Sequence, residues 1–143
     1  MLESSPTNMQ TTQTGGCMCG AARYAFTGEP EIILNCHCTD CQKASGGQFA
    51  TIIALRAEHF TSSGKLTFYE WHGSSGTLLR RGFCPICGTT VFGYPPNPDV
   101  RNIWAGTLDD GDWVVPTLDH WLKSRKPWSV PLDTTEKCSN AFE

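Results

Sequence analysis

Cys36-His37-Cys38-Thr39-Asp40-Cys41 is the densest of three cysteine clusters in this sequence, and the other two are Cys17-Met18-Cys19 and Cys84-Pro85-Ile86-Cys87. Seven of the eight cysteines lie in these clusters, while Cys138 lies alone near the C-terminus. Such thiols can serve as a disulfide framework, as a redox-active pair or as ligands of zinc. The fold and the function both depend on which of these uses is correct.

The spacing of the cysteines disfavours the first two uses. Cysteines two residues apart rarely meet the Cα separation and torsion of an S–S bond. Residues 1–13 lack the basic and apolar regions of a secretory signal, which favours a reducing, cytoplasmic compartment where thiols stay reduced. A redox-active Cys-x-x-Cys normally lies at the N-terminus of a helix. Here Gly88 and Thr89-Thr90-Val91 follow the second cysteine of the pair, and they predict a turn and then a strand. We therefore favour zinc.

Two of the clusters are predicted to share one closed zinc site. A structural zinc takes four ligands, and close pairs of thiolates commonly supply them. Cys17 with Cys19 and Cys84 with Cys87 are such pairs, and each pair is followed at once by a glycine. Glycine lets the backbone turn under the metal and direct N–H groups at sulfur. This site would connect the N-terminal strand to the middle of the chain.

The remaining cluster predicts a second zinc of a different kind. Cys36, Cys38 and Cys41 lie within six residues, so one loop can direct all three sulfurs at one ion. Three protein ligands and a vacant position are typical of a zinc that binds a ligand or does chemistry. We expect solvent or substrate in that position and Cys138 to be a free thiol. The alternatives are closure by His37 or Asp40, or a structural zinc closed by a distant His59, His72 or His120.

Short strands dominate the expected architecture, which is a mainly antiparallel β domain held together by metal. Residues 1–14 are polar and are expected to form a disordered tail, residues 15–131 a single domain, and residues 132–143 a C-terminal tail. A short helical turn is expected at residues 39–45. Strands are expected at residues 22–26, 31–35, 49–55, 66–71, 76–83, 89–94, 101–105 and 113–115.

Composition argues against several classes of protein. Charged residues make up 17% of the chain, which is too few for a disordered protein of high net charge. No apolar run approaches the roughly 20 residues of a membrane-spanning helix. A net charge of -3 leaves no excess of cations to neutralise phosphates, so we expect neither a nucleic-acid partner nor a membrane.

The motifs resemble those of a known family, the glutathione-dependent formaldehyde-activating enzymes, which also include the centromere protein V domain. The resemblance runs from about residue 15 to residue 131. It implies an all-β, Mss4-like fold of zinc-stapled antiparallel sheets with little helix, and two zinc ions on the cysteines divided as above. The matching stretches are Gly16–Gly20, Arg23-Tyr24, Cys36–Lys43, Ser45-Gly46, Gly82–Thr89, Gly106–Asp110, Pro116, His120-Trp121, Ser124 and Lys126–Trp128.

The same resemblance implies a carbon–sulfur lyase that adds glutathione to formaldehyde, as an S-(hydroxymethyl)glutathione synthase does. Cys36, Cys38 and Cys41 would then be the catalytic metal ligands, with glutathione or a related thiol as the small-molecule partner. A thiol carrier without turnover, a structural zinc interaction domain and a homo-oligomer stay open. His37, Gln42, Lys43, Gly46 and Gly47 are the expected substrate-binding residues. The cations that can receive the carboxylates of glutathione are Lys43, Arg80, Arg81, Lys123 and Arg125.

Overall fold

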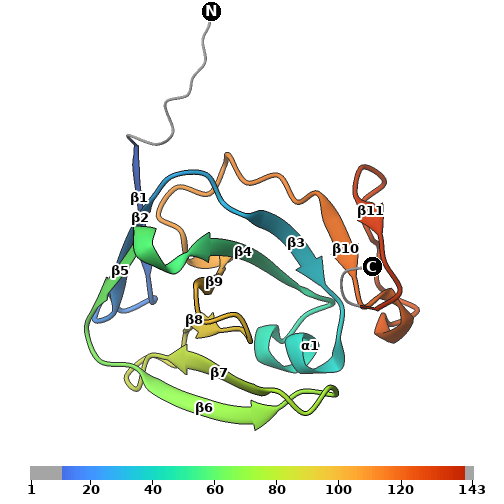
Figure 1. Cartoon of the computed structure of the whole chain (residues 1–143), viewed down its shortest axis with the longest axis horizontal. Helices are drawn as coiled ribbons and strands as arrows, with labels where there is room; N and C mark the ends of the chain where they lie inside the picture. Colours follow the sequence, from blue (N-terminus) through green and yellow to red (C-terminus); the bar gives the residue numbers. More distant parts are fainter. Residues whose placement is uncertain (1–10, 141–143) are drawn as a thin grey trace, which may run out of the picture.

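The computed structural model describes residues 11–140, and β-strands form most of its regular structure (Figure 1). The helical elements are α1 (Thr39–Ser45) and 3₁₀ turns at Ala57–His59, Ala105–Thr107 and Leu122–Ser124. The strands are β1 (Thr12–Gly16), β2 (Arg23–Thr27), β3 (Ile32–Cys36), β4 (Ala50–Arg56), β5 (Phe60–Ser63), β6 (Thr67–His72), β7 (Leu78–Phe83), β8 (Thr90–Tyr94), β9 (Val100–Trp104), β10 (Leu118–His120) and β11 (Glu136–Lys137).

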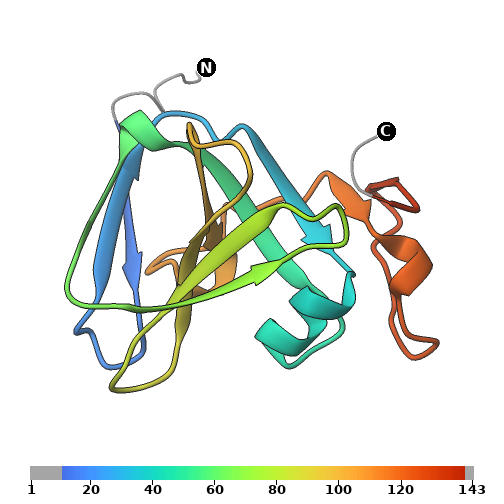
Figure 2. The same ribbon diagram turned by 60° about the horizontal axis from the view of Figure 1, so that its bottom comes forward.

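The strands form two sheets. A small sheet has the order β1-β2-β5, and a large sheet has the order β11-β10-β3-β4-β9-β8-β7-β6. Neighbouring strands are antiparallel except that β10 runs parallel to both β3 and β11. Figure 2 shows the small sheet standing beside the large one, with α1 and the C-terminal segment at the opposite end. The predicted all-β, Mss4-like fold class is therefore confirmed.

Strand β4 separates two hydrophobic cores because it is buried on both faces. Successive side chains of a strand point to opposite faces, so Ile53 and Leu55 lie on one side and Ala50 and Ile52 on the other. The first pair packs with Tyr24 and other residues of the small sheet in the first core. The second pair belongs to a separate second core near α1. Each core contains part of one cysteine cluster.

The C-terminal segment belongs to the fold instead of forming the expected tail. Strand β11 pairs with β10, and Thr135 and Cys138 are buried. Cys138 packs in the core that contains Cys36 and Leu118, and its thiol is unpaired. The packing supplied by β10 explains why these polar residues are ordered. The expected N-terminal tail at residues 1–14 also differs, because β1 begins at Thr12. Residues 1–10 and 141–143 of the two expected tails lie outside the described residues.

Most expected strands are present within one or two residues of their predicted bounds, and the expected helical turn at residues 39–45 is α1. Residues 113–115 are an exception, since they form no strand. Trp113 lies in a turn that the N–H of Val114 closes by donating to the carbonyl of Gly111. Trp113 instead donates its indole N–H to the carbonyl of Asp110 and packs against the first core. Among the described residues, no helix has the length and apolar character needed to cross a membrane.

Substitution of Ile53 tests the position of the first core. Ile53→Ala should lower the free energy of unfolding by about 2–5 kcal/mol, because the side chain is fully buried and its removal leaves a cavity. Urea denaturation measures the change. Val115→Ala is the control, since that side chain is 64% exposed and its truncation should change stability by less than about 0.5 kcal/mol. Equal effects of the two substitutions would contradict the assigned core.

Candidate metal centres and substrate pocket

The four cysteines at the junction of the two sheets converge on one point. Cys17 and Cys19 follow β1, Cys84 and Cys87 follow β7, and their four sulfurs all lie within 4.8 Å of one another. The Cys17 and Cys19 sulfurs are 3.6 Å apart, and those of Cys19 and Cys84 are 3.7 Å apart. A tetrahedron with Zn–S bonds of about 2.3 Å has an edge of about 3.8 Å. The four sulfurs therefore fit a closed zinc site.

The backbone around these pairs is shaped for metal-bound sulfur. Gly20 and Gly88 have φ values of 83° and 79°, a left-handed conformation that glycine adopts without strain. The N–H of Ala22 donates to the Cys17 sulfur at 3.3 Å, and the N–H two residues after Cys84 donates to that sulfur at 3.4 Å. These donors would stabilise the negative charge of bound thiolates.

The second cluster lies where β3 leads into α1. Cys36 ends β3, Cys38 caps the N-terminus of α1, and Cys41 lies in its first turn. The Cys38 sulfur accepts a hydrogen bond from the N–H of Cys41 at 3.3 Å, and the three sulfurs lie within 4.8 Å of one another. Among the described residues, no histidine or carboxylate joins the three sulfurs within that distance. The structure thus provides three converging sulfurs that could hold a metal ion.

Electrostatic interactions within the second cluster favour a thiolate at its centre. Hydrogen bonds with the sulfurs of Cys36 and Cys41 lower the pKa of the Cys38 thiol to about 3. The contact with Cys38 raises the pKa of the Cys36 thiol to about 12, and the contacts with Cys36 and Cys38 raise that of Cys41. These contacts favour negative charge at Cys38 over Cys36 and Cys41, and a cation that replaces the thiol protons would bind all three sulfurs as thiolates.

His37, between two of the cysteines, is fixed from three directions. Its backbone N–H donates to the carbonyl of His120, and its carbonyl accepts from the side chain of Gln42 at 2.7 Å. Its imidazole Nε2–H donates to the Asp119 carboxylate at 2.7 Å, and neither side chain is exposed. A fully buried imidazole cannot contact a substrate in this conformation. These contacts let His37 hold the cysteine loop, and its expected substrate-binding role stays a prediction.

Asp119 connects this loop to the C-terminal segment. The Thr135 hydroxyl donates to its second carboxylate oxygen, and the ammonium of Lys137 lies 3.5 Å from that oxygen. Burial would raise the pKa of the Asp119 carboxyl, but hydrogen bonds from Thr135 and His37 outweigh burial and hold the pKa below its usual value. Asp119 therefore stays charged and paired in the interior.

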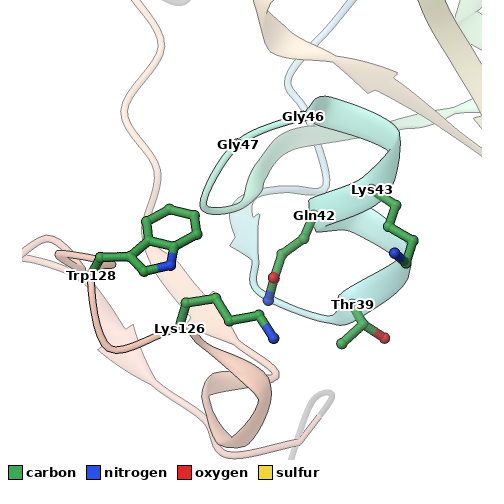
Figure 3. Close-up of a pocket in the computed structure, with 7 residues that line it drawn as sticks. All are labelled: Thr39, Gln42, Lys43, Gly46, Gly47, Lys126 and Trp128. Atoms are coloured by element: carbon green, nitrogen blue, oxygen red, sulfur yellow. The ribbon is translucent and has the colours of Figure 1, made fainter.

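A cavity of about 270 Å³ opens beside α1, the helix that also carries Cys41 (Figure 3). One wall comes from α1 and the turn after it, and the other comes from the segment at residues 124–130. Gln42 donates to the carbonyl of Ser124 at 2.9 Å, and the side chain of Gln48 accepts from the N–H of Val130 at 2.9 Å, so this segment is fastened at both ends. The lining residues are Thr39, Gln42, Lys43, Gly46, Gly47, Lys126 and Trp128.

The expected carboxylate-binding cations do not gather in one place. Lys43 lines the cavity, whereas the side chain of Lys123 lies over the Trp121 ring and Arg125 donates to the carbonyl of Ser129. The guanidinium groups of Arg80 and Arg81 stack on aromatic rings of the large sheet.

Sequence reasoning missed the two cavity residues from the C-terminal part of the chain and also missed Asp119. Lys126 and Trp128 lie more than 80 residues after α1, and only their place in the Lys126-Pro127-Trp128 motif pointed to them. The suggested ligand roles of Asp40 and the histidines find no support in the geometry. Asp40 accepts a hydrogen bond from the indole of Trp71 at 3.0 Å and stands outside the sulfur group.

Comparison with known proteins identifies the family of the chain. The model of the glutathione-dependent formaldehyde-activating enzyme family matches residues 12–124, most of the sequence. The chain belongs to this family. The fold of this family member is also similar to the crystal structure of a Rhodobacter sphaeroides protein, with a TM-score of 0.54 and 22% sequence identity over 72% of this chain and 91% of that chain.

Replacing one cysteine from each cluster of this family member should separate their roles. Cys84→Ser should unfold the domain, because a structural zinc contributes about 10 kcal/mol or more to folding in small zinc peptides. Cys38→Ser should remove one metal ion and leave most of the fold intact. Circular dichroism and metal analysis of the purified variants measure both effects. Unfolding of both variants to the same extent would contradict the division into two different sites.

Removal of the Asp119 carboxylate should weaken metal binding at the second cluster. Asp119→Ala leaves the imidazole of His37 buried without its acceptor, so the loop that carries Cys36 and Cys38 loses a fixed point. We expect zinc affinity at this cluster to fall about tenfold, as for other residues that orient metal ligands. Titration with a competing chelator measures it. Asp112→Ala is the exposed control, and unchanged affinity in Asp119→Ala would refute the anchoring role.

Proposed function

We propose that this protein is a zinc-dependent carbon–sulfur lyase that acts on glutathione or a related thiol adduct, with an S-(hydroxymethyl)glutathione synthase-like reaction. The observation that carries the proposal is the second cluster, in which three sulfurs converge and no fourth His, Cys, Asp or Glu side chain from the described residues joins them. Membership in a family described as glutathione-dependent and formaldehyde-activating supports a thiol as the missing ligand.

The thiol chemistry of the second cluster suits zinc. Cys36, Cys38 and Cys41 form a soft donor set, for which zinc is a preferred divalent ion. A zinc ion bound there would supply a position at which a substrate thiol, with a free pKa of about 8.5, is held as a thiolate at neutral pH. Zinc on Cys17, Cys19, Cys84 and Cys87 would serve the fold instead.

The protein's contribution to the reaction is to hold the thiol compound and to balance its charge. In the forward direction the thiol of glutathione loses its proton, and the sulfur lone pair forms a bond to the carbonyl carbon of formaldehyde. The C=O π electrons move to oxygen, which takes up one proton, equal in number to that lost from sulfur, and becomes the hydroxyl group of the adduct. Lys43 and Lys126 provide positive charge in the adjacent cavity, where a substrate carboxylate can pair with them. The indole of Trp128 offers an apolar wall.

Reduced thiols are a requirement of this proposal. All eight cysteines are unpaired in the structure, including Cys138 in the second core. Oxidation of Cys36, Cys38 or Cys41 would remove the donor set for metal. We therefore propose that the protein acts in a reducing compartment, the cytoplasm, where glutathione is abundant and such thiols persist.

Kinetics with formaldehyde and glutathione test the proposal. The zinc-loaded protein should form S-(hydroxymethyl)glutathione faster than the spontaneous reaction, and Cys38→Ser should abolish the acceleration. Lys43→Gln and Lys126→Gln should each raise KM for glutathione about tenfold, because a hydrogen bond to a charged group contributes about 1.5 kcal/mol or more. Exchange spectroscopy by proton NMR measures the rates.

Lys123→Gln is the matched control, since the ammonium of Lys123 lies over the Trp121 ring and does not line the cavity. Its KM should equal that of the unmodified protein. If glutathione binds with no acceleration over the spontaneous rate, the protein is a thiol carrier and the lyase assignment is wrong.

A further inference from the structure

Residues 123–132, which we call the basic-apolar segment, expose several apolar side chains to solvent. Trp128, Val130 and Leu132 are 64%, 74% and 42% exposed, whereas Ser129 between the first two is buried. Such alternation is typical of an extended stretch that has one side against the protein and the other side in water. Figures 1 and 2 show this C-terminal part of the chain at one end of the molecule, beyond β10.

Hydrogen bonds fix the backbone that presents these side chains. The N–H of Val130 donates to the side chain of Gln48 at 2.9 Å, and Arg125 donates to the carbonyl of Ser129 at 2.9 Å. The side chain of Val130 therefore cannot turn inward unless these contacts break and Ser129 leaves its buried position. Single exposed apolar residues are ordinary on a protein surface, but several neighbours held in water together indicate an interaction site.

Cations accompany the apolar side chains. Lys123, Arg125 and Lys126 are all exposed, and there is no Asp or Glu from residue 120 to residue 132. Since the whole chain has a net charge of -3, the residues outside this stretch have a net charge of -6. The acidic total thus conceals a local excess of positive charge. An anionic surface would attract this end of the molecule and repel the remainder, so the charge distribution also sets the orientation of approach.

We propose that the basic-apolar segment binds reversibly to the anionic surface of a phospholipid membrane. Trp128, Val130 and Leu132 would enter the headgroup region, where tryptophan is enriched in proteins that contact membranes. Lysine and arginine near the surface would add attraction to anionic lipids. Attachment of this kind combines an apolar and a basic contribution and needs no membrane-spanning helix. The expectation of no membrane partner came from the net charge of the whole chain, which does not report a local patch.

The chemistry of the segment favours a membrane over a second copy of the chain. An interface between two copies of this segment would place its cations against like charges, which is unfavourable without anions between them. A bilayer supplies anions and an apolar layer at adjacent depths, and it adapts to the shape of the exposed side chains. This inference goes beyond the proposed function and does not depend on it.

Sedimentation with lipid vesicles tests the proposal on the full-length, zinc-loaded protein. One set of vesicles contains phosphatidylcholine alone, and the other contains phosphatidylcholine mixed with phosphatidylserine. The partition coefficient should be about 100-fold higher for the mixed vesicles, as expected for three cations near an anionic surface. Raising the salt concentration should reduce this difference, because ions screen exposed charges.

Matched substitutions locate the contact surface. Val130→Ser should lower the partition coefficient for mixed vesicles about tenfold, because an apolar side chain no longer leaves water on binding. Val115→Ser is the control, since this valine is 64% exposed but lies outside the segment. Lys123→Gln should lower the coefficient about fivefold, and Lys65→Gln, at an exposed lysine elsewhere, should leave it unchanged. Circular dichroism of the four variants verifies that they are folded.

Each other result overturns the proposal. Equal binding to neutral and mixed vesicles would refute the role of anionic lipid. Equal effects of Val130→Ser and Val115→Ser would show that the segment is not the contact surface. Absence of vesicle binding, together with dimers in sedimentation velocity that Val130→Ser disrupts, would assign the segment to self-association. The kinetics with glutathione are measured without vesicles, so failure of this inference is distinct from failure of the proposed function.

Discussion

The convergence of four sulfurs at the junction of the two sheets is the constraint on which the architecture depends. Cys17 and Cys19 belong to the turn after the first strand of the small sheet, and Cys84 and Cys87 belong to a turn of the large sheet. A small sheet of three short strands buries little surface by itself, so a connection to the large sheet fixes how the first core closes. Metal bonds at this point would contribute to folding directly.

The two faces of β4 explain why the two cysteine clusters can serve different purposes. Ile53 and Leu55 face the core that contains the four-cysteine cluster, whereas Ala50 and Ile52 face the core that contains Cys36. Because the second cluster is held through His37 and Asp119, its loop has protein contacts that do not depend on metal. The four-cysteine cluster and the three-cysteine cluster thereby lie on opposite sides of one strand.

Local patterns made the clusters, most strands and α1 predictable, since ligand spacing and alternation are properties of neighbouring residues. Long-range partners were not predictable in this way. Asp119 follows His37 by 82 residues, and nothing in its own neighbourhood indicates a buried acceptor. The polar composition of residues 132–143 suggested a tail, but pairing of β11 with β10 outweighs that local tendency. Residues 113–115 have strand-like side chains but no neighbouring strand to pair with in the structure.

The arrangement of the second cluster favours holding a thiol over activating a water molecule. Three thiolates already outnumber the charge of one Zn²⁺, so the Lewis acidity of the ion would be low compared with that of a histidine-ligated zinc. A fourth thiolate adds a further negative charge, and the protein places Lys43 and Lys126 in the neighbouring cavity, where they can offset it. Under the proposed function, catalysis at such a centre would depend mainly on positioning the sulfur, so residues that orient the thiol would matter as much as those that hold the metal.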